Sequence, residues 1–388
     1  MKNNKKAVMY GAGNIGRGFI AQLFYMSGYE TVFIDVNEEV IDSINKDGEY
    51  PIFITTNDKY DEFTVKNVRA VNGRNINEVA EEISTADIMA TAVGVNVLNY
   101  IVKPIAAGIK LRFENNGKPL NIIICENKIN VDKYLSGLLI NEFAAQAEKD
   151  YFTENIGLVE PSIGRMVPVT PDDIKAQFPL AVCVESYNEL PVDKSGFKGE
   201  IPDIKNMKPY APFEYYIQRK LFLHNMCHAL VSYLGYLKGY KYIWEAVGDA
   251  EIRYKALGAL IESSCALNKE HKADIYSLIL ASYDLLNRFD NKLLGDTIDR
   301  VGKDTKRKLS EDDRIVGAVK LCLKHDINPD NILNGLAAGL LFKPENDDNS
   351  IEVYNFTKTH GVKESLKRYC GIDEVNICEK IENIYKTL

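Results

Sequence analysis

The sequence predicts an α/β protein whose N-terminal domain contains a doubly wound, mostly parallel sheet and whose C-terminal domain is mostly α-helical. Three observations lead to this fold class. The 388 residues exceed what one hydrophobic core usually serves, so two domains are expected. In the first third of the chain, apolar strand patterns alternate with helical ones, which is typical of a parallel sheet with crossover helices. Beyond residue 210 nearly every apolar pattern has helical spacing.

The chain begins with a predicted buried strand at residues 6–10, a glycine-rich turn at 11–18, a helix, and a second strand at 30–34 that ends at Asp35. A G-x-G-x-x-G pattern between strand and helix, followed by an acid after the next strand, is the fingerprint of dinucleotide binding. The predicted fold of this domain is therefore the Rossmann fold. The cofactor-binding residues expected in this segment are Tyr10, Gly11, Ala12, Gly13, Asn14, Ile15, Gly16 and Asp35.

Each part of this fingerprint has a physical reason. Gly11 permits the tight turn, Gly13 lets the backbone approach a pyrophosphate, and Gly16 lets the helix pack close to the strand. The helix N-terminus presents free N–H groups and a favourable dipole to the phosphates. Asp35 can accept hydrogen bonds from ribose hydroxyls and would repel a 2′-phosphate, so NAD is expected rather than NADP.

The alternation continues with strands expected at residues 65–71, 87–93 and 120–125, separated by helices at 76–86 and 97–113. Ligands of such sheets bind beyond the carboxyl ends of the strands.

Two of these strand ends carry candidate site residues. Thr91, Val93 and Gly94 end one strand and are expected to contact the cofactor. Asn127 follows the next strand, where its amide could reach the oxygen of a reacting carbon; the alternative is a turn-forming asparagine.

The pattern loosens between residues 150 and 200, where an exposed strand is expected at 181–187. Glycines and a proline at 195–204 indicate the domain junction. The predicted domains are residues 1–195, which bind NAD, and residues 196–388, which carry substrate-binding and catalytic groups. The helices expected in the second domain cover residues 212–235, 242–268, 273–287, 311–325, 331–342 and 363–369.

The helix that opens the second domain carries Lys220, His224, Asn225 and His228. At about 100° per residue these side chains lie within an arc of about 140°, and apolar residues occupy the other side. An amine, an amide and an imidazole on one face could deprotonate an alcohol and stabilise the resulting oxyanion. The alternative is an ordinary solvated helix face.

A third cluster, residues 299–309, contains five cations and two acids in an otherwise acidic chain. Basic side chains held together bind phosphate or carboxylate, arginine by bidentate pairing, so this segment is a candidate anion-binding site. The alternative is a solvated loop.

Composition excludes several classes of protein. A net charge of −8 gives no general affinity for nucleic acid or acidic membranes. The seven cysteines are scattered and never spaced as CxxC, which argues against a disulfide framework or a structural zinc, and no metal is expected. The basic start, MKNNKK, is followed by too few apolar residues for a signal peptide, and no run of about 18 apolar residues exists. We expect a cytoplasmic protein, as a monomer or weak dimer.

The three motifs, in this order, resemble those of the polyol-specific long-chain dehydrogenases, and within them the mannitol-1-phosphate 5-dehydrogenase branch. The similarity covers nearly the whole chain. It is carried by residues 11–19 (GAGNIGRGF), 121–127 (NIIICEN), 195–199 (SGFKG), 219–222 (RKLF) and 307–309 (RKL).

This resemblance implies NAD-dependent interconversion of D-mannitol 1-phosphate and D-fructose 6-phosphate in mannitol metabolism, without a metal. By position, Lys220 matches the family's general base, Asn225 and Asn127 match amides that hold the reacting oxygen, and His228 matches the imidazole. The resemblance also assigns substrate contacts to two residues of the basic cluster, Arg300 and Lys308, and suggests Arg307 for the phosphate.

Two departures from the family pattern leave alternatives open. Gly164 replaces an aspartate expected near the substrate, and Gln218 replaces a glutamate two residues before the lysine. The loss of two carboxylates predicts a more cationic site. The same mechanism could therefore act on a hexuronate or another sugar or polyol, or the chain could be a non-catalytic NAD-binding protein.

Overall fold

A computed structural model describes residues 5–56, 59–128 and 130–388 of the chain. The first four residues, with which the basic start of the chain begins, lie outside these. The chain forms two compact units, Met1–Phe213 and Glu214–Leu388. The junction expected at residues 195–204 lies inside the first unit, because β10 (Leu190–Asp193) and β11 (Met207–Tyr210) pair with each other on either side of it.

The first unit is built on a six-stranded parallel sheet in the order β5-β2-β1-β6-β7-β8. The strands are β1 (Lys5–Tyr10), β2 (Tyr29–Asp35), β5 (Val68–Asn72), β6 (Ile88–Thr91), β7 (Leu120–Ile124) and β8 (Ile156–Val159). From β1 the chain moves outward to β2 and β5, and then crosses back so that β6 pairs with the other side of β1. The carboxyl ends of β1 and β6 therefore form the switch point, where ligands of such sheets bind. The predicted doubly wound, mostly parallel sheet is confirmed.

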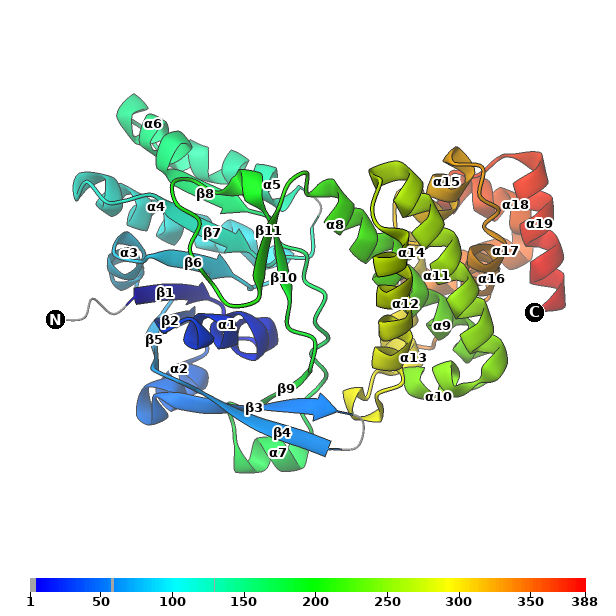
Figure 1. Ribbon diagram of the computed structural model, residues 1–388, viewed down its shortest axis with the longest axis horizontal. Coiled ribbons are helices and arrows are strands. Elements are labelled where there is room, and N and C mark those ends of the chain that lie inside the picture. The colour runs from blue at the N-terminus through cyan, green and yellow to red at the C-terminus, as the bar shows by residue number, and fades with distance from the viewer. Residues whose placement is uncertain (1–4, 57–58, 129) are drawn as a thin grey trace. The chain divides into compact units, whose positions relative to one another are not determined.

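Alternate residues of β1 point to two separate cores. Ala7 and Met9 pack with α1 (Ala21–Met26) and α2 (Glu38–Asp47), while Val8 and Tyr10 pack with the helices of the opposite face. Those helices are α3 (Ile76–Ser84), α4 (Leu98–Glu114), α5 (Val131–Leu139) and α6 (Gln146–Asn155). Figure 1 shows the two sets of helices on either side of the sheet. Burial on both faces explains why these strands are apolar throughout.

The remaining strands correct two expectations. The single strand expected at residues 65–71 is two strands, because β4 (Lys59–Lys66) pairs with β3 (Glu49–Thr56) and β5 begins only after Asn67, whose φ of 59° breaks the extended backbone. The strand expected to be exposed at 181–187 is β9 (Val182–Glu185), and it is buried. It pairs with β3, and a Cβ atom at Gly18 would lie 2.7 Å from the Val182 side chain. The short helix α7 (Asp172–Gln177) precedes β9.

The second unit is helical, as predicted, and α9 is its central helix. Its helices are α8 (Glu214–Arg219), a π-helical turn (Lys220–Asn225), α9 (Met226–Leu237), α10 (Ile243–Gly248), α11 (Ala250–His271), α12 (Ile275–Phe289), α13 (Ile298–Gly302), α14 (Thr305–Lys308), α15 (Val316–Lys324), α16 (Asp330–Gly339), α17 (Asp348–His360), α18 (Val362–Ser365) and α19 (Val375–Thr387). Helix α9 is buried along nearly its whole length and packs against α10, α11, α13 and α16 (Figure 1). Within the described ranges, no helix is both long and apolar enough to span a bilayer.

Candidate active site

The glycine-rich turn after β1 is tightly packed at both ends and open in the middle. Gly11 has a φ of +102°, and a Cβ atom there would lie 2.5 Å from the Ala92 carbonyl oxygen. A Cβ atom at Gly16 would lie 2.1 Å from the carbonyl oxygen of Gly11. A Cβ atom at Gly13, by contrast, would meet no atom of the described residues within 4 Å. Packing therefore requires the outer two glycines, while Gly13 leaves free space where a pyrophosphate would approach the backbone.

Asp35 fixes this turn, a role that the sequence analysis did not give it. Its Oδ2 accepts a 2.7 Å hydrogen bond from the Ala12 amide, and its Oδ1 accepts from the amides of Val36 and Asn37 at 2.8 and 3.0 Å. Each carboxylate oxygen offers about two acceptor positions, so Oδ2 keeps room for a further donor. The carboxylate can hold the turn and still accept from a ribose hydroxyl.

The helix after the turn carries a buried cation, Arg17, in its π-helical first part, Gly16–Ile20. Only 8% of Arg17 is exposed, and its Nε has no hydrogen-bond partner among the described residues. Burial lowers the pKa of Arg17, while Tyr50 and Asp35 act in the opposite direction. A buried guanidinium nitrogen without an acceptor is costly, so the chemistry of this position fits an anionic or polar ligand.

The carboxyl ends of β6 and β7 are joined by Glu126, which the sequence analysis missed. Its two carboxylate oxygens accept 2.8 Å hydrogen bonds from the amides of Val93 and Gly94. The signal that could have identified it is its position directly beyond a buried strand. Thr91 is fully buried beneath this turn, whereas Asn127 is exposed.

The other predicted cofactor residues differ in exposure. Tyr10 and Ala12 are buried, Ile15 is half-buried and Asn14 is exposed.

In the second unit, the predicted catalytic helix contains a π-helical turn, which corrects the angles derived for a regular α-helix. The Met226 amide bonds to the Leu221 carbonyl, five residues earlier, and the Phe222 carbonyl also accepts a 2.8 Å hydrogen bond from the Ser263 hydroxyl on α11. In such a turn, residues five apart are about one turn apart. Lys220 and Asn225 therefore come closer to a common side than the 140° of an α-helix allows.

Two histidines of this unit, His224 and His228, have pKa values that are lowered by burial and also by predicted site residues. Burial lowers the pKa of His224, and Lys220 and His228 add to this effect. Burial also lowers the pKa of His228, and Arg300 and Lys308 act in the same direction. The geometry supports part of this grouping, because the His224 and His228 rings lie 5.9 Å apart and His228 and Arg300 both contact Asp296. Asn225, at the end of the π turn, is half-buried.

The basic cluster is partly neutralised rather than free. Arg307 pairs with Asp304 at 2.7 Å and with Asp313 at 3.1 Å, while Arg300 pairs with Asp296. Lys308 differs from both arginines, because it is 7% exposed and its Nζ donates a 2.6 Å hydrogen bond to the Val301 carbonyl.

Lys308 is also the strongly perturbed amine of the cluster. Burial, with the charges of Arg314 and Arg307, lowers the pKa of Lys308 to about 7. Sequence spacing had no means of revealing this shift, because it depends on burial and on Arg314.

Both departures from the family pattern have a local structural account. A Cβ atom at Gly164 would lie 3.3 Å from Cε1 of Tyr187, so the tyrosine ring occupies the space beside the missing side chain. Gln218 donates to Glu214 at 3.1 Å and lies 2.9 Å from the His271 ring nitrogen.

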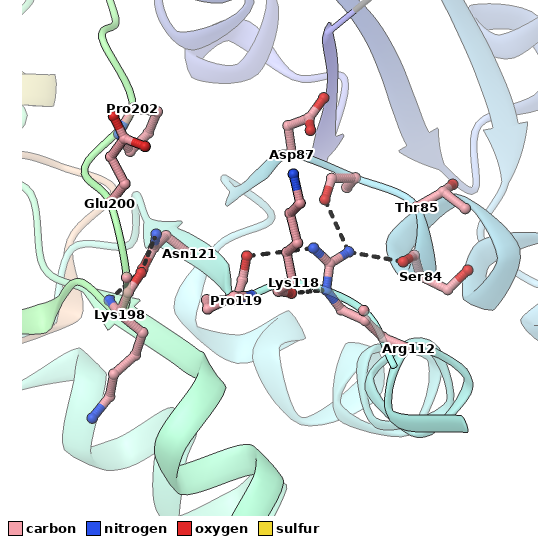
Figure 2. Close-up of a pocket in the computed structure, with 13 residues that line it drawn as sticks. Ser84, Thr85, Asp87, Arg112, Lys118, Pro119, Asn121, Lys198, Glu200 and Pro202 are labelled. Atoms are coloured by element: carbon pink, nitrogen blue, oxygen red, sulfur yellow. Dashed lines mark hydrogen bonds between the residues drawn. The ribbon is translucent and has the colours of Figure 1, made fainter. Parts of the chain in front are cut away.

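A separate pocket of about 520 Å³ lies on the first unit at the amino ends of β6 and β7, opposite the glycine-rich turn (Figure 2). Its buried guanidinium, Arg112, donates to the backbone carbonyls of Ser84 at 2.8 Å and Lys118 at 2.6 Å. The Asn121 amide is likewise bonded to the backbone N–H and carbonyl of Lys198. These polar groups hold the chain together, and the pocket contains none of the predicted site residues. Among the described residues, no group of three or more His, Cys, Asp or Glu side chains could hold a metal.

Comparison with known proteins identifies the family to which both parts of the chain are similar. Residues 5–206 match the mannitol dehydrogenase Rossmann domain, and residues 213–386 match the mannitol dehydrogenase C-terminal domain. The chain is 38% identical over 387 residues to the mannitol-1-phosphate 5-dehydrogenase of Thermoanaerobacter pseudethanolicus, covering 99% of this chain and 98% of that protein. It is 38% identical over 371 residues to the enzyme of the same name from Clostridium acetobutylicum, covering 95% of each.

Solved structures show the same fold. A substrate-free D-sorbitol dehydrogenase is similar with a TM-score of 0.83 at 13% identity, covering 99% of this chain and 93% of that one. The mannitol 2-dehydrogenase of Pseudomonas fluorescens, solved as a ternary complex with NAD and D-mannitol, is similar with a TM-score of 0.73 at 13% identity, covering 100% and 92%. At such identity these similarities concern the fold alone.

Proposed function

The chain belongs to the mannitol dehydrogenase family, and from this premise we propose that it is an NAD-dependent dehydrogenase that interconverts D-mannitol 1-phosphate and D-fructose 6-phosphate. The observation that carries the proposal is the 38% identity, over 99% of the chain, to a relative with that activity in its name. We further propose that it acts in the cytoplasm, as a monomer or weak dimer.

The glycine-rich turn suits NAD. Gly13 leaves space at its Cβ position, Asp35 keeps acceptor capacity on Oδ2, and the buried Nε of Arg17 finds no acceptor among the described residues. Free N–H groups at the helix start and a nearby guanidinium both favour phosphate groups. In the bound state, NAD would supply the hydride acceptor for the carbinol carbon.

The protein's own contribution is proton transfer and charge stabilisation. In this proposal Lys220 Nζ takes the hydroxyl proton of the polyol, and the Asn225 amide donates to the oxygen as negative charge develops on it. Asn127 of the first unit is the proposed second amide donor, and the His228 imidazole hydrogen-bonds a substrate hydroxyl. Arg300, Arg307 and Lys308 are the proposed substrate contacts, with the phosphate at Arg307.

The experiment that tests this function is NADH oxidation with fructose 6-phosphate, run in parallel with unphosphorylated fructose, tagaturonate and fructuronate. We expect a strong preference for the phosphorylated sugar. Activity with a uronate alone would show that Gly164 marks a change of substrate, and the cations of the second unit would then hold a carboxylate. NAD binding without turnover of any of the four sugars would identify a non-catalytic NAD-binding protein.

A further inference from the structure

Asp296 is a buried carboxylate in contact with two of the predicted site residues. It lies just before α13, is 7% exposed, and places Oδ2 3.4 Å from His228 Nε2, while Oδ1 accepts from an Arg300 amino group. A buried carboxylate is strongly unfavourable unless it is paired. Here both partners belong to the set of residues proposed to bind substrate.

The backbone around Asp296 is held on both sides. Its carbonyl accepts a 2.9 Å hydrogen bond from the Ile243 amide, and the Ile298 amide donates to the Lys241 carbonyl at 2.9 Å. The Ile298 carbonyl in turn accepts 2.8 Å from the buried Ser232 hydroxyl of α9, the helix that carries His228. The backbone that carries Asp296 is therefore tied to the helix that carries His228 by hydrogen bonds that involve neither of these two side chains.

The His228 ring is fixed as well. It stacks on Phe289 with centroids 4.6 Å apart and an interplanar angle of 15°. Its Nε2 is buried, with no standard hydrogen-bond partner in the described part of the chain, so Asp296 is the acceptor within reach. The 3.4 Å separation is long for a hydrogen bond, so the contact is chiefly electrostatic.

An ionised carboxylate can only accept hydrogen bonds, so Asp296 favours the form of the His228 ring that carries a proton on the facing nitrogen. Burial, Arg300 and Lys308 keep His228 neutral at pH 7 despite the opposing effect of Asp296, because together they lower its pKa. A neutral imidazole has one N–H, and a carboxylate facing Nε2 is stabilised when that nitrogen carries it. Nδ1 is then the ring's acceptor.

We propose that Asp296 is a positioning residue that keeps the proton of neutral His228 on Nε2 and holds Arg300 beside it. His228 then presents Nδ1 to the substrate as a hydrogen-bond acceptor for a hydroxyl group. The assignment of that hydroxyl rests on the proposed function, whereas the assignment of the ring's proton does not.

The test is ¹⁵N NMR of histidine-labelled protein, in which the nitrogen shifts distinguish the two neutral ring forms. The chain has five histidines, and the His228→Gln variant identifies the signal that belongs to His228. We expect wild-type His228 at pH 8 to carry its proton on Nε2, and Asp296→Asn to shift the ring toward the other form. A wild-type ring with its proton on Nδ1, or a ring unaffected by Asp296→Asn, would overturn the proposal.

Kinetics add a second readout. Asp296→Asn should lower kcat/KM for the polyol phosphate about tenfold or more, the usual cost of losing a residue that orients a functional histidine. NAD affinity should stay within about twofold, and Asp284→Asn, an equal charge change at an exposed position of α12, should change neither. A kcat/KM within twofold of wild type would contradict the positioning role. If the wild type itself does not turn over the phosphate, the proposed function fails while the NMR result still decides the role of Asp296.

Discussion

The Ser263 hydroxyl donates a 2.8 Å hydrogen bond to the Phe222 carbonyl, in the middle of the π turn that runs from Lys220 to Asn225. Ser263 is fully buried on α11, so this contact ties the proposed catalytic turn to the longest helix of the second unit. Removal of a buried hydroxyl from such a contact costs about 1–3 kcal/mol.

Ser263→Ala should therefore lower both stability and turnover, because the turn that separates Lys220 from His228 loses its support. The matched control is Ser264→Ala, which removes the neighbouring buried hydroxyl, whose partner is the Ser282 hydroxyl of α12 at 3.1 Å. Both variants should unfold at lower temperature, but only Ser263→Ala should also lower kcat. Equal kcat values in the two variants would show that the contact supports only the fold.

Lys220→Ala should lower turnover about 100-fold or more, the usual contribution of a general base, and should leave NAD affinity unchanged. Lys255→Ala, which removes a lysine paired with Glu251 on α11, serves as the control and should retain full activity. Stopped-flow measurement of NADH formation separates the chemical step from product release. Turnover that survives in Lys220→Ala would exclude Lys220 as the base.

Asp35→Ala should weaken NAD binding and relax the preference over NADP, because the variant loses both an acceptor for the ribose and the anchor of the Ala12 amide. Asp87→Ala is the matched control, since that carboxylate accepts a 2.7 Å hydrogen bond from the Lys6 amide at the opposite end of the sheet. Isothermal titration of each variant with both cofactors checks the prediction. If the NAD to NADP ratio is unchanged in Asp35→Ala, Asp35 does not determine cofactor choice.

Lys308 should make binding of the sugar phosphate depend on pH. With a pKa of about 7, this buried amine is charged below that pH and neutral above it, so the KM for the phosphate should rise as pH increases from about 6 to 8.5. The arginine of Lys308→Arg stays charged over this whole range, so the KM of this variant should change less with pH. Titration of the substrate's phosphate group affects both proteins equally. Parallel KM profiles in the two proteins would exclude a role for the Lys308 charge.

The same shift predicts a stability effect of known sign. The pKa of a lysine in the unfolded chain is about 10.4. Between about pH 7 and 10 the unfolded chain therefore binds more protons at this position than the folded chain does. The folded state therefore gains stability as pH rises through this window, relative to Lys308→Met, which cannot titrate. Urea unfolding of both proteins at pH 7 and pH 9.5 measures the difference, and a constant difference would contradict the depressed pKa of Lys308.

Local patterns were sufficient to predict the fold class and the dinucleotide turn. Gly16 packs against the Gly11 carbonyl and Asp35 accepts from the Ala12 amide, so the spacing of these residues along the chain carries the information directly. Gly11 is required by the Ala92 carbonyl, which lies far along the chain, but its place in the G-x-G-x-x-G pattern was sufficient to identify it. The hairpin of β3 and β4 was missed because its strands are only partly buried and pair with each other and with β9, more than 100 residues later. Such pairing leaves no mark in the local pattern.

The second unit shows where sequence reasoning stops. A π turn has no simple residue signature, so regular α-helical angles were the natural assumption for Lys220 and Asn225. Asp296 belongs to no sequence motif, and its importance follows only from its contact with His228. Glu126 follows a buried strand, but its role became clear only from its hydrogen bonds with the Val93 and Gly94 amides. The roles assigned to Lys220, Asn225 and Asn127 remain predictions.

The π turn between α8 and α9 has a consequence for comparing related chains. A π turn is an α-helix that accommodates one additional residue, so deletion of a single residue between 221 and 224 would let the backbone relax to regular α geometry. Lys220 would then lie four residues before the asparagine, about 40° from it on an α-helix, and would keep nearly the same orientation relative to His228. A relative that lacks this residue would therefore present both side chains on the same face with a spacing one residue shorter, so the gap in an alignment belongs inside this turn.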